Sequence, residues 1–372
     1  MPARTLQFNS NSPYRRFIGV GGIGTGLFFA LEGNHTLGRN ESRPARLRNI
    51  RDYCKLHIIS HYIAVLLGAQ PGGSPFHVVP VGKVGSDDGG RRMIQEMADA
   101  GMDIRHIELL RDQPTLFSVC FQYPDGSGGN ITTTESAASA LDCNDIDRCS
   151  GLFASNSPRC MVLAAPEVPL ETRGHLLRLS GGHQAFRAAA FTSAEVATAR
   201  QEGIFALVDL VAMNEDEAGM LIGERFDPAN SQRFLDRCAD TLLSFQQNIQ
   251  IILSAGGHGA FAFSGGTWDY RPALNVPVVS TAGAGDALLA GVLSALAVGL
   301  PLIKPGPTAA SSSERPLESA FDLGMLLAAY KVTSPHTIHP DANVDTLLSF
   351  GHDLGITFSV AMREHLQLTP SA

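Results

Sequence analysis

The sequence lacks a long hydrophobic run, a signal peptide and any paired cysteine motif. No apolar run reaches the roughly 18 residues that a membrane span needs. Residues 1–11 are polar and lack the apolar core of a signal peptide. The six cysteines form no Cys-x-x-Cys pair, which argues against both a zinc site and a disulfide framework. We therefore expect a cytoplasmic protein with reduced thiols and no membrane partner.

The chain is also short of positive charge. It has 28 Lys and Arg against 36 Asp and Glu, which gives a formal net charge of −8. A general nucleic-acid binder normally presents a basic surface, so we expect no nucleic-acid partner. The 44% hydrophobic and 17% charged content is ordinary for a globular chain, and 372 residues can bury a large core.

The most informative stretch lies between residues 275 and 299. A β-favouring run at 276–279 is followed by a small-residue turn at 282–285 and by an apolar, helix-favouring segment at 287–298. This order predicts a strand, a tight loop and a helix. A helix start leaves backbone N–H groups without partners and carries the positive end of the helix dipole. The junction therefore favours a bound anion.

Asp286 stands at this junction, where its carboxylate would compete with an anion unless it has another task. It could take a proton from a hydroxyl nucleophile, or it could simply cap the helix, and residue type alone favours neither. Residues 280–286, Ser-Thr-Ala-Gly-Ala-Gly-Asp, resemble the second signature of the ribokinase-like, or PfkB, carbohydrate kinases. The resemblance implies a catalytic base at Asp286 and an anion hole for the transferred phosphoryl group at the amides of Ala282, Gly283, Ala284 and Gly285.

A second glycine pattern lies near the N-terminus. Residues 19–24 read Gly-x-Gly-x-x-Gly after a short apolar strand, which fits a dinucleotide-binding fingerprint with Glu41 as its acidic ribose ligand. The apolar segment that follows ends before Gly33, and this is too short for the crossover helix of that fingerprint. We therefore favour a first sheet strand that continues into a lid strand.

The middle of the chain predicts the fold. Residues 82–103 are similar to a Gly-x-Val-Gly-x-Asp-x-x-Gly segment and helix of the same family, and residues 114–134 alternate as a β-hairpin. Strands and helices then alternate between residues 160 and 210, which predicts a largely parallel sheet with helices on both faces. We predict a single ribokinase-like α/β domain over residues 1–372. Its small β lid is expected at about residues 25–50 and 114–134.

Two further motifs match the nucleotide side of the family. Asn214 and Glu217 fit its Asn-x-x-Glu motif, whose Glu acts on magnesium through water, although unaided the acidic cluster indicates a negatively charged helix start. Ser254, Gly256 and Gly259 fit its Gly-rich nucleotide loop. The Pro-, Ser- and Ala-rich residues 304–316 predict a loop near the nucleotide edge, before a last core helix at 317–330.

Residues 39–69 allow more than one interpretation. Five arginines between residues 39 and 51 indicate either a solvated loop or helix face, or a basic flap that meets phosphate groups. A helix is expected over residues 52–69, with His57 and His61 four residues apart on one side. No third ligand accompanies this pair, so a polar or exposed pair is favoured over a metal site.

The substrate half departs from the family pattern. Ser280 replaces an Asp that is tied in the family to a monovalent-cation site, and Gly26 lies near the position of the Asp that binds substrate hydroxyls. The Gly-Gly-x-x-x-Asn of the first signature is not recognisable at residues 54–60. We therefore expect an acceptor other than an ordinary furanose or hexose. The candidate substrate residues are Arg39, Lys55 and His57.

The resemblance implies a kinase that transfers the γ-phosphoryl group of ATP to a hydroxyl of a sugar or nucleoside-like small molecule. It also implies Mg²⁺ held through water near Glu217 and a homodimer formed through the lid. One alternative is a catalytically inactive nucleotide- or sugar-binding regulator of the same fold. Another is a nicotinamide-dependent oxidoreductase built on residues 19–24, for which no catalytic set is recognisable.

Overall fold

The core of the fold is a mostly parallel β-sheet. The computed structural model describes residues 4–125, 128–153, 159–304 and 316–366. Within them the sheet has nine strands in the order β13-β12-β11-β10-β9-β8-β1-β4-β5. The strands from β11 to β5 run parallel, and β12 and β13 form an antiparallel hairpin at one edge. The bounds are β1 Arg16–Val20, β4 His77–Gly85, β5 Ile107–Leu110, β8 Cys160–Ala164, β9 Phe186–Ala190, β10 Leu210–Asn214, β11 Gln250–Ser254, β12 Ala260–Ser264 and β13 Thr267–Arg271.

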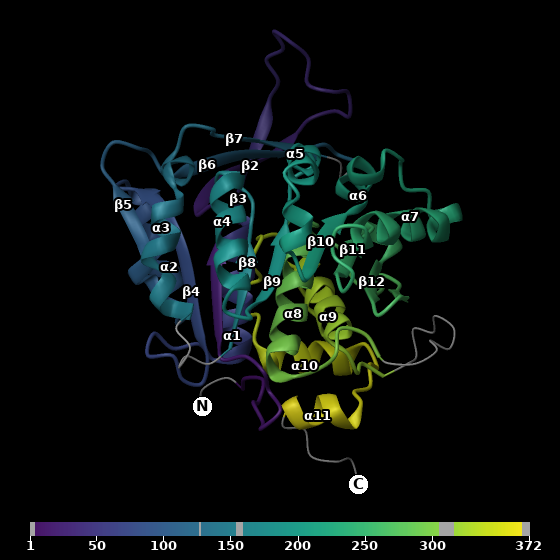
Figure 1. The fold of residues 1–372 in the computed structure, drawn as a ribbon. Coiled ribbons are helices and arrows are strands. Elements are labelled where there is room, and N and C mark those ends of the chain that lie inside the picture. The colour runs from purple at the N-terminus through teal and green to yellow at the C-terminus, as the bar shows by residue number, and fades with distance from the viewer. Residues whose placement is uncertain (1–3, 126–127, 154–158, 305–315, 367–372) are drawn as a thin grey trace.

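Helices cover both faces of this sheet, as predicted (Figure 1). One face packs against α1 (Lys55–Leu67), α2 (Asp88–Asp99), α8 (Ala284–Val298), α9 (Ala320–Val332), α10 (Val344–Asp353) and α11 (Val360–Leu366). The other packs against α3 (Cys143–Arg148), α4 (Leu170–Gly181), α5 (Val196–Gln201), α6 (Glu215–Ile222) and α7 (Ser231–Leu243). Because both faces are covered, central strands such as β8 are buried at every residue.

A second, smaller sheet forms the predicted lid. Its strands are β2 (Gly24–Leu31), β3 (Ala45–Tyr53), β6 (Leu116–Gln122) and β7 (Gly128–Thr132), in the order β3-β2-β6-β7. It lies at the top of the view in Figure 1. Strand β1 runs almost directly into β2, which confirms the expected strand-to-lid connection. Since β2 is a strand, the crossover helix that a dinucleotide fingerprint would need at residues 24–31 is not formed.

Helices α8 and α9 pack unusually close together. A Cβ atom placed on Gly291 of α8 would lie 2.7 Å from the Cα atom of Gly324 in α9. The two glycines therefore allow the helix backbones to touch, which brings the C-terminal end of α9 against the loop that precedes α8. Both helices are almost entirely buried, and their sequences are correspondingly apolar on all sides.

Three sequence predictions of local structure were wrong. Residues 276–279 are not a strand: no neighbouring strand pairs with them in the described residues, and Pro277 removes a donor. Residues 45–53 form the lid strand β3, so neither the loop nor the helix face considered for residues 39–51 applies there, and the helix expected from residue 52 begins at Lys55. The strand expected at residues 207–210 begins only at Leu210, after a 3₁₀ turn. The predicted loop at 304–316 falls almost wholly on residues 305–315, outside the described residues.

The structure also bears on the expectations about membrane spans and cysteines. Within the described residues, no helix combines the length and the hydrophobicity that crossing a bilayer requires. All six cysteines are free thiols, and four of them are buried in the core.

Candidate active site

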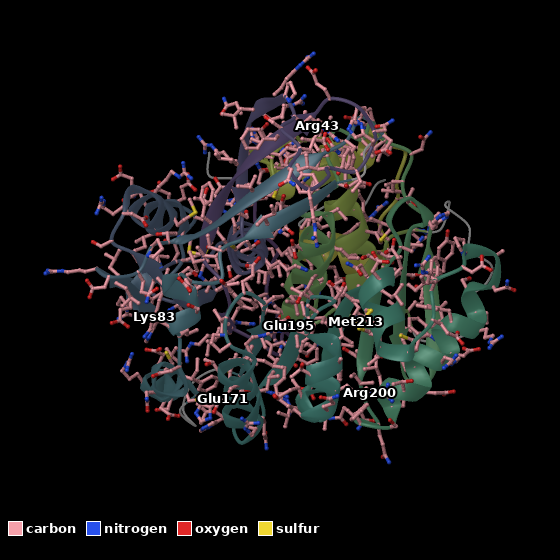
Figure 2. All side chains as sticks on the ribbon, turned by 90° about the horizontal axis from the view of Figure 1, so that it is seen from above. Arg43, Lys83, Glu171, Glu195, Arg200 and Met213 are labelled. Atoms are coloured by element: carbon pink, nitrogen blue, oxygen red, sulfur yellow. The ribbon has the colours of Figure 1, made fainter. Side chains whose placement is uncertain are left out.

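Residues predicted for catalysis, cofactor binding and substrate binding come together at the carboxyl ends of the parallel strands. Asn214 ends β10, Ser254 ends β11, Lys55 begins α1 and Asp286 lies in the first turn of α8. These four line one pocket, together with Glu217, Gly283 and Gly285. In the view from above, Met213, which precedes Asn214, lies near the middle of the molecule, and Arg43 of the lid lies at its rim (Figure 2). This edge of an open α/β sheet is the place where ligands usually bind.

The loop before α8 has the geometry of an anion-binding site. Gly283 is the N-cap residue with φ = 81°, a conformation that side-chain-bearing residues rarely adopt, and a Cβ atom there would lie 2.6 Å from the carbonyl oxygen of Thr337. The N–H of Ala282 donates to Ser280 Oγ and that of Ala284 to the Thr281 carbonyl.

Three backbone donors remain open at this helix start. Within the described residues the N–H groups of Gly283, Gly285 and Asp286 have no hydrogen-bond acceptor. Of the four amides predicted for the anion hole, those of Gly283 and Gly285 are therefore open, whereas those of Ala282 and Ala284 are used within the loop. Open N–H groups at the positive end of a buried 15-residue helix suit a phosphoryl group.

Two ammonium groups act electrostatically on the carboxyl group of Asp286. Burial raises the pKa of its carboxyl, and the ammonium groups of Lys55 and Lys331 act in the opposite direction. Burial would lower the pKa of Lys55, but the carboxylates of Asp286 and Glu217 outweigh it, so that this pKa is raised. The pocket thus holds a charged lysine beside a carboxylate with raised proton affinity. Such a carboxylate is suited to accept a proton from a hydroxyl group.

Asn214 and Glu217 form a capping box at the start of α6. Asn214 Oδ1 accepts from the Glu217 N–H at 2.8 Å, and Glu217 Oε2 accepts from the Asn214 N–H at 2.9 Å. The Asn-x-x-Glu spacing is therefore explained in part by helix capping. The second oxygen, Oε1, lies 3.9 Å from Lys55 Nζ and faces the pocket that contains Asp286. The cap fixes one oxygen of Glu217 and leaves the other available.

A second pocket adjoins the first and has apolar walls. Ser254, Gly256 and Gly259 line it, and it shares Asn214, Ser254 and Gly285 with the pocket around Asp286. Gly259 has φ = 87°, and a Cβ atom there would lie 2.1 Å from the Arg271 carbonyl oxygen. The opposite wall consists of apolar side chains, from the segment before α8 and from α9: Leu274, Val276, Val278, Met325, Ala328, Ala329 and Val332. Exposed Val278, which lacks a sheet partner, is therefore part of a pocket wall.

Two carboxylates near Asp286 were missed from the sequence. Glu167 follows β8 and has φ = 75°, a strained conformation for a residue with a side chain, and burial raises its pKa to about 7. Asp52 is the penultimate residue of the lid strand β3 and is 7% exposed. Both exert an electrostatic effect on the Cys54 thiol, and Asp52 raises the pKa of Asp286. The one sequence signal for Glu167 was its position just after a buried strand.

Asp52 takes the space beside a glycine. Its Oδ2 accepts from Ser118 Oγ at 2.9 Å and from Cys120 Sγ at 3.3 Å, both in β6. A Cβ atom on Gly26 would lie 2.4 Å from that same Oδ2. Within the described residues Oδ1 has no hydrogen-bond partner, yet it is not a fully buried atom. Asp52 therefore presents one fixed and one accessible oxygen under the lid.

The three candidate substrate residues lie in different places. Lys55 is in the pocket with Asp286. Arg39 is exposed in the connection between β2 and β3 and lines neither of the two pockets described above. His57 is 1% exposed and lines a separate cavity with Tyr53 and His61. Two residues along a helix differ by about 200° in direction, which explains why Lys55 and His57 point apart.

Comparisons with known proteins agree with this arrangement. The sequence profile of the pfkB family carbohydrate kinases matches residues 63–343. The chain belongs to this family. The match includes α8 with Asp286, the Asn214–Glu217 cap and the glycine loop after β11, and it begins within α1, after Lys55.

Individual relatives are more distant than the family match. Over 226 residues the chain is 26% identical to a bifunctional ribokinase/ribose-5-phosphate isomerase A of Fructilactobacillus sanfranciscensis. This alignment covers 60% of this chain and 39% of that protein. The chain thus spans about two fifths of the length of this curated relative. A ribokinase from Cryptococcus neoformans in complex with ADP has a TM-score of 0.67 at 18% identity, covering 90% of this chain and 99% of that one. A nucleoside kinase from Burkholderia thailandensis in complex with inosine has a TM-score of 0.66 at 16% identity, covering 92% and 99%. These structures establish the ribokinase-like fold.

Proposed function

We propose that this PfkB-family protein transfers the γ-phosphoryl group of ATP to a hydroxyl group of a neutral, polyhydroxylated small molecule. The observation that carries the proposal is the position of Asp286, in the first turn of a helix whose N–H groups at Gly283 and Gly285 are open. Asp286 takes the proton of the acceptor hydroxyl as its oxygen bonds to the γ-phosphorus. The bond from that phosphorus to the bridging oxygen breaks, and ADP leaves. The open N–H groups stabilise the charge on the transferred group.

The nucleotide is assigned to the second pocket. Ser254, Gly256 and Gly259 form its polar floor, and the apolar wall of α9 fits the face of a nucleobase. The pocket joins the Asp286 pocket through Asn214 and Gly285, so phosphate groups that run from one to the other would end at the open amides.

Magnesium fits the acidic side of the Asp286 pocket. Within the described residues no three His, Cys, Asp or Glu side chains form a metal cage. Mg²⁺ commonly keeps several waters and is shared between few carboxylates and substrate phosphates, so Glu217 Oε1 and Asn214 would hold it through water. A bound Mg²⁺ would neutralise negative charge on the phosphate groups.

The acceptor side supports an uncharged substrate. The carboxylates of Asp286, Glu217 and Glu167 act on Lys55, and an acceptor that carries a phosphate group would be repelled by them. Asp52 adds a further carboxylate that acts on Asp286. Hydroxyl groups would instead donate to Asp52 Oδ1 and to Glu167. We therefore propose Lys55, Asp52 and Glu167 as acceptor residues, because Asp52 acts electrostatically on Asp286 and Glu167 on Lys55. We leave out Arg39, which is exposed in the β2–β3 connection, and His57, which lines a separate cavity.

The test is an ADP-release assay with MgATP against sugars, nucleosides and phosphosugars. Asp286→Asn is expected to lower kcat by about 10²–10⁴-fold with an unchanged fold, because only the general base is lost. Asp88→Asn is the matched control, since Asp88 also lies in the first turn of a helix but is fully exposed. Turnover that survives in Asp286→Asn would contradict the assigned base. ATP binding without turnover on any acceptor would favour the inactive regulator.

A further inference from the structure

A cavity on the other side of β3 and α1 belongs to neither pocket of the active site. It lies between β3, α1, the end of α2 and the segment at residues 336–340, and it has a volume of about 630 Å³. Its walls include Tyr53, His57, His61, Glu96, His336 and Ile338. Alternate residues of β3 and every fourth residue of α1 supply these side chains, so one stripe of the strand faces one stripe of the helix. We call this space the histidine cavity.

Three side chains of the histidine cavity carry buried polar atoms without partners. Within the described residues, His57 Nδ1, His61 Nδ1 and Glu96 Oε2 are buried and form no hydrogen bond. Leaving a buried polar atom unpaired costs free energy, and native proteins rarely leave several around one cavity. His57 itself is 1% exposed. These three atoms are themselves closed off from solvent, but the His61 and Glu96 side chains are partly exposed, so a polar ligand in the cavity would meet those two side chains.

The charges of the histidine cavity favour an uncharged ligand. Burial lowers the pKa of His57 well below its usual value and that of His61 to about 4, so both imidazoles are neutral near pH 7. The lining also contains Arg51, but Glu96 and Asp99 oppose it, which disfavours a phosphate or carboxylate ligand. A hydroxyl group both donates and accepts, and it therefore matches neutral imidazole nitrogens as well as the Glu96 carboxylate.

The aromatic walls add a second preference. The rings of Tyr53 and His57 lie 4.6 Å apart at 55°, and the rings of His57 and His61 lie 6.2 Å apart. His57 is buried by these contacts, so the partly exposed rings of Tyr53 and His61 are the ones that can meet the apolar side of a sugar ring or a nucleobase. A compact, ring-shaped molecule with several hydroxyl groups matches both these rings and the partly exposed side chains of His61 and Glu96.

The histidine cavity is connected to the active site by three segments. Arg51 and Tyr53 line it and stand on either side of Asp52, which faces the acceptor side under the lid. His336 and Ile338 line it and stand on either side of Thr337, whose carbonyl oxygen packs against Gly283 of the anion-binding loop. His57 lies two residues after Lys55 on the same helix.

Backbone hydrogen bonds join two of these segments. The Thr337 N–H donates to the Arg51 carbonyl at 3.2 Å, and the Arg51 N–H donates to His336 Nδ1 at 3.0 Å. A ligand that orders His336 and Ile338 therefore also fixes β3 and the position of the Thr337 carbonyl against Gly283. Ligand binding in the histidine cavity and the geometry of the anion-binding loop in the active site are therefore linked through the same residues.

We propose that the histidine cavity binds a second uncharged, hydroxyl-rich ring molecule and that this binding regulates phosphoryl transfer at Asp286. The molecule is either a second copy of the acceptor or a different polyol or nucleoside. The regulatory part rests on the proposed kinase function, whereas the binding part does not.

The binding test uses D-ribose, myo-inositol and adenosine as probes on the full chain, measured by isothermal titration calorimetry. At least one probe is expected to bind wild type and Asp52→Asn equally, and to bind at least about tenfold more weakly to Glu96→Gln, which removes a charged acceptor. Val65→Phe, which fills the cavity from α1, is expected to act in the same way. Glu202→Gln is the control, because Glu202 is exposed and follows α5 on the opposite face of the sheet.

Two binding results would overturn the proposal. One is that no probe binds wild type. The other is that every binding event is lost in Asp52→Asn and unchanged in both Glu96→Gln and Val65→Phe. Melting curves of the two cavity variants identify any loss that comes from unfolding, and Val65→Phe provides a second test if Glu96→Gln is unstable.

The regulatory test is the initial rate at saturating acceptor with and without the bound probe. A change in kcat that disappears in Glu96→Gln supports regulation. If the ligand is the acceptor itself, the initial rate of wild type should not follow a hyperbola when it is plotted against acceptor concentration. The rate of Glu96→Gln should follow one. Binding without any effect on rate would overturn regulation. Binding to a protein without kinase activity would instead contradict the proposed function.

Discussion

The ammonium group of Lys331 donates a hydrogen bond to the backbone carbonyl of Ser280 at 2.9 Å. The Lys331 side chain is completely buried at the C-terminal end of α9, and burial lowers its pKa to about 8 while Asp286 opposes that shift. Ser280 is the position where the family usually has an Asp tied to a monovalent-cation site. A fixed positive charge from the chain itself therefore lies behind the anion-binding loop.

We predict that the kinase reaction does not depend on a monovalent cation. The rate should change less than about twofold when KCl replaces NaCl, because Lys331 already supplies the buried charge. Lys331→Met should lower kcat at least about tenfold, since the loop loses a buried charged donor. Lys304→Met is the control, because Lys304 is 58% exposed. A wild-type enzyme that requires K⁺ would contradict this role of Lys331.

Glu167 should make stability depend on pH. Its pKa is raised by burial from an ordinary 4.5 to about 7, so the folded state binds a proton in this window that the unfolded chain has released. The stabilisation is therefore fully present below the unfolded pKa and is lost as the pH rises through 7. Glu167→Gln should be more stable than wild type at pH 8, by at most about 3 kcal/mol, and equal to it at pH 4.

Chemical denaturation at both pH values measures this difference, with Glu171→Gln, an exposed change in α4, as the control. The same Glu167→Gln variant should bind the acceptor more weakly, because a hydroxyl-accepting carboxylate is removed. Equal stability of the variant and wild type at pH 8 would mean that Glu167 is charged without cost in the folded state.

Asp52 should determine acceptor affinity. Asp52→Asn keeps the size of the side chain but weakens an acceptor of hydroxyl protons, so KM for the acceptor should rise about 10–100-fold with KM for ATP unchanged. Ser118→Ala removes a donor to Asp52 Oδ2 and should raise the same KM less. An equal rise in both KM values would indicate a general change of the lid rather than a lost contact with the acceptor.

Gly283→Ala should abolish turnover. The new Cβ atom would lie 2.6 Å from the Thr337 carbonyl oxygen, and the φ of 81° at this position disfavours a side chain. The loop must therefore move, and its open N–H groups would no longer point at the transferred phosphoryl group. We expect kcat to fall at least about 100-fold, as when an oxyanion-hole donor is lost. Gly203→Ala is the matched control, because Gly203 has φ = 67° but nothing within 4 Å of an added Cβ. Gly203→Ala should lower the stability of the protein and leave its turnover unchanged.

The outer strands of the lid should mediate a homodimer. Leu47 in β3 is 60% exposed and Ile131 in β7 is 67% exposed, and both strands are edges of the small sheet. Unpaired strand edges with exposed apolar side chains favour pairing with a second chain. Sedimentation velocity of wild type should show a dimer, and the double variant Leu47→Lys/Ile131→Lys a monomer. A monomeric wild type at micromolar concentration would contradict the prediction.

The sequence predicted those parts of the site that depend on local chemistry. A glycine-rich turn before an apolar helix reveals the anion-binding loop at Gly283, and Asn-x-x-Glu spacing reveals the α6 cap, because both are formed within a few residues. The strand-to-lid connection was predictable for the same reason. The βαβ rhythm likewise predicted the parallel sheet.

The sequence could not predict contacts made by distant segments. Glu167 reaches the site because β8 lies beside β1 in the sheet, and Asp52 because β3 folds over the carboxyl ends of the strands. His57 was grouped with Lys55 by proximity in sequence, but the turn of α1 directs it into the histidine cavity. Residues 276–279 have strand-like composition, yet within the described residues they pair with no strand, and the Val279 N–H donates instead to the Val332 carbonyl of α9.

The backbone of Thr337 completes the active site, although Thr337 follows all the sequence motifs of that site along the chain. Its N–H bonds to Arg51 beside Asp52, and its carbonyl oxygen supports Gly283. Every motif of the kinase lies before residue 287, but the shape of the catalytic loop depends on a residue fifty positions further along the chain. A chain that ended at Asp286 would therefore contain every motif, yet it would lack the Lys331 ammonium group and the Thr337 carbonyl that shape the loop. The site is complete only when the segment after α9 packs between the lid and the loop.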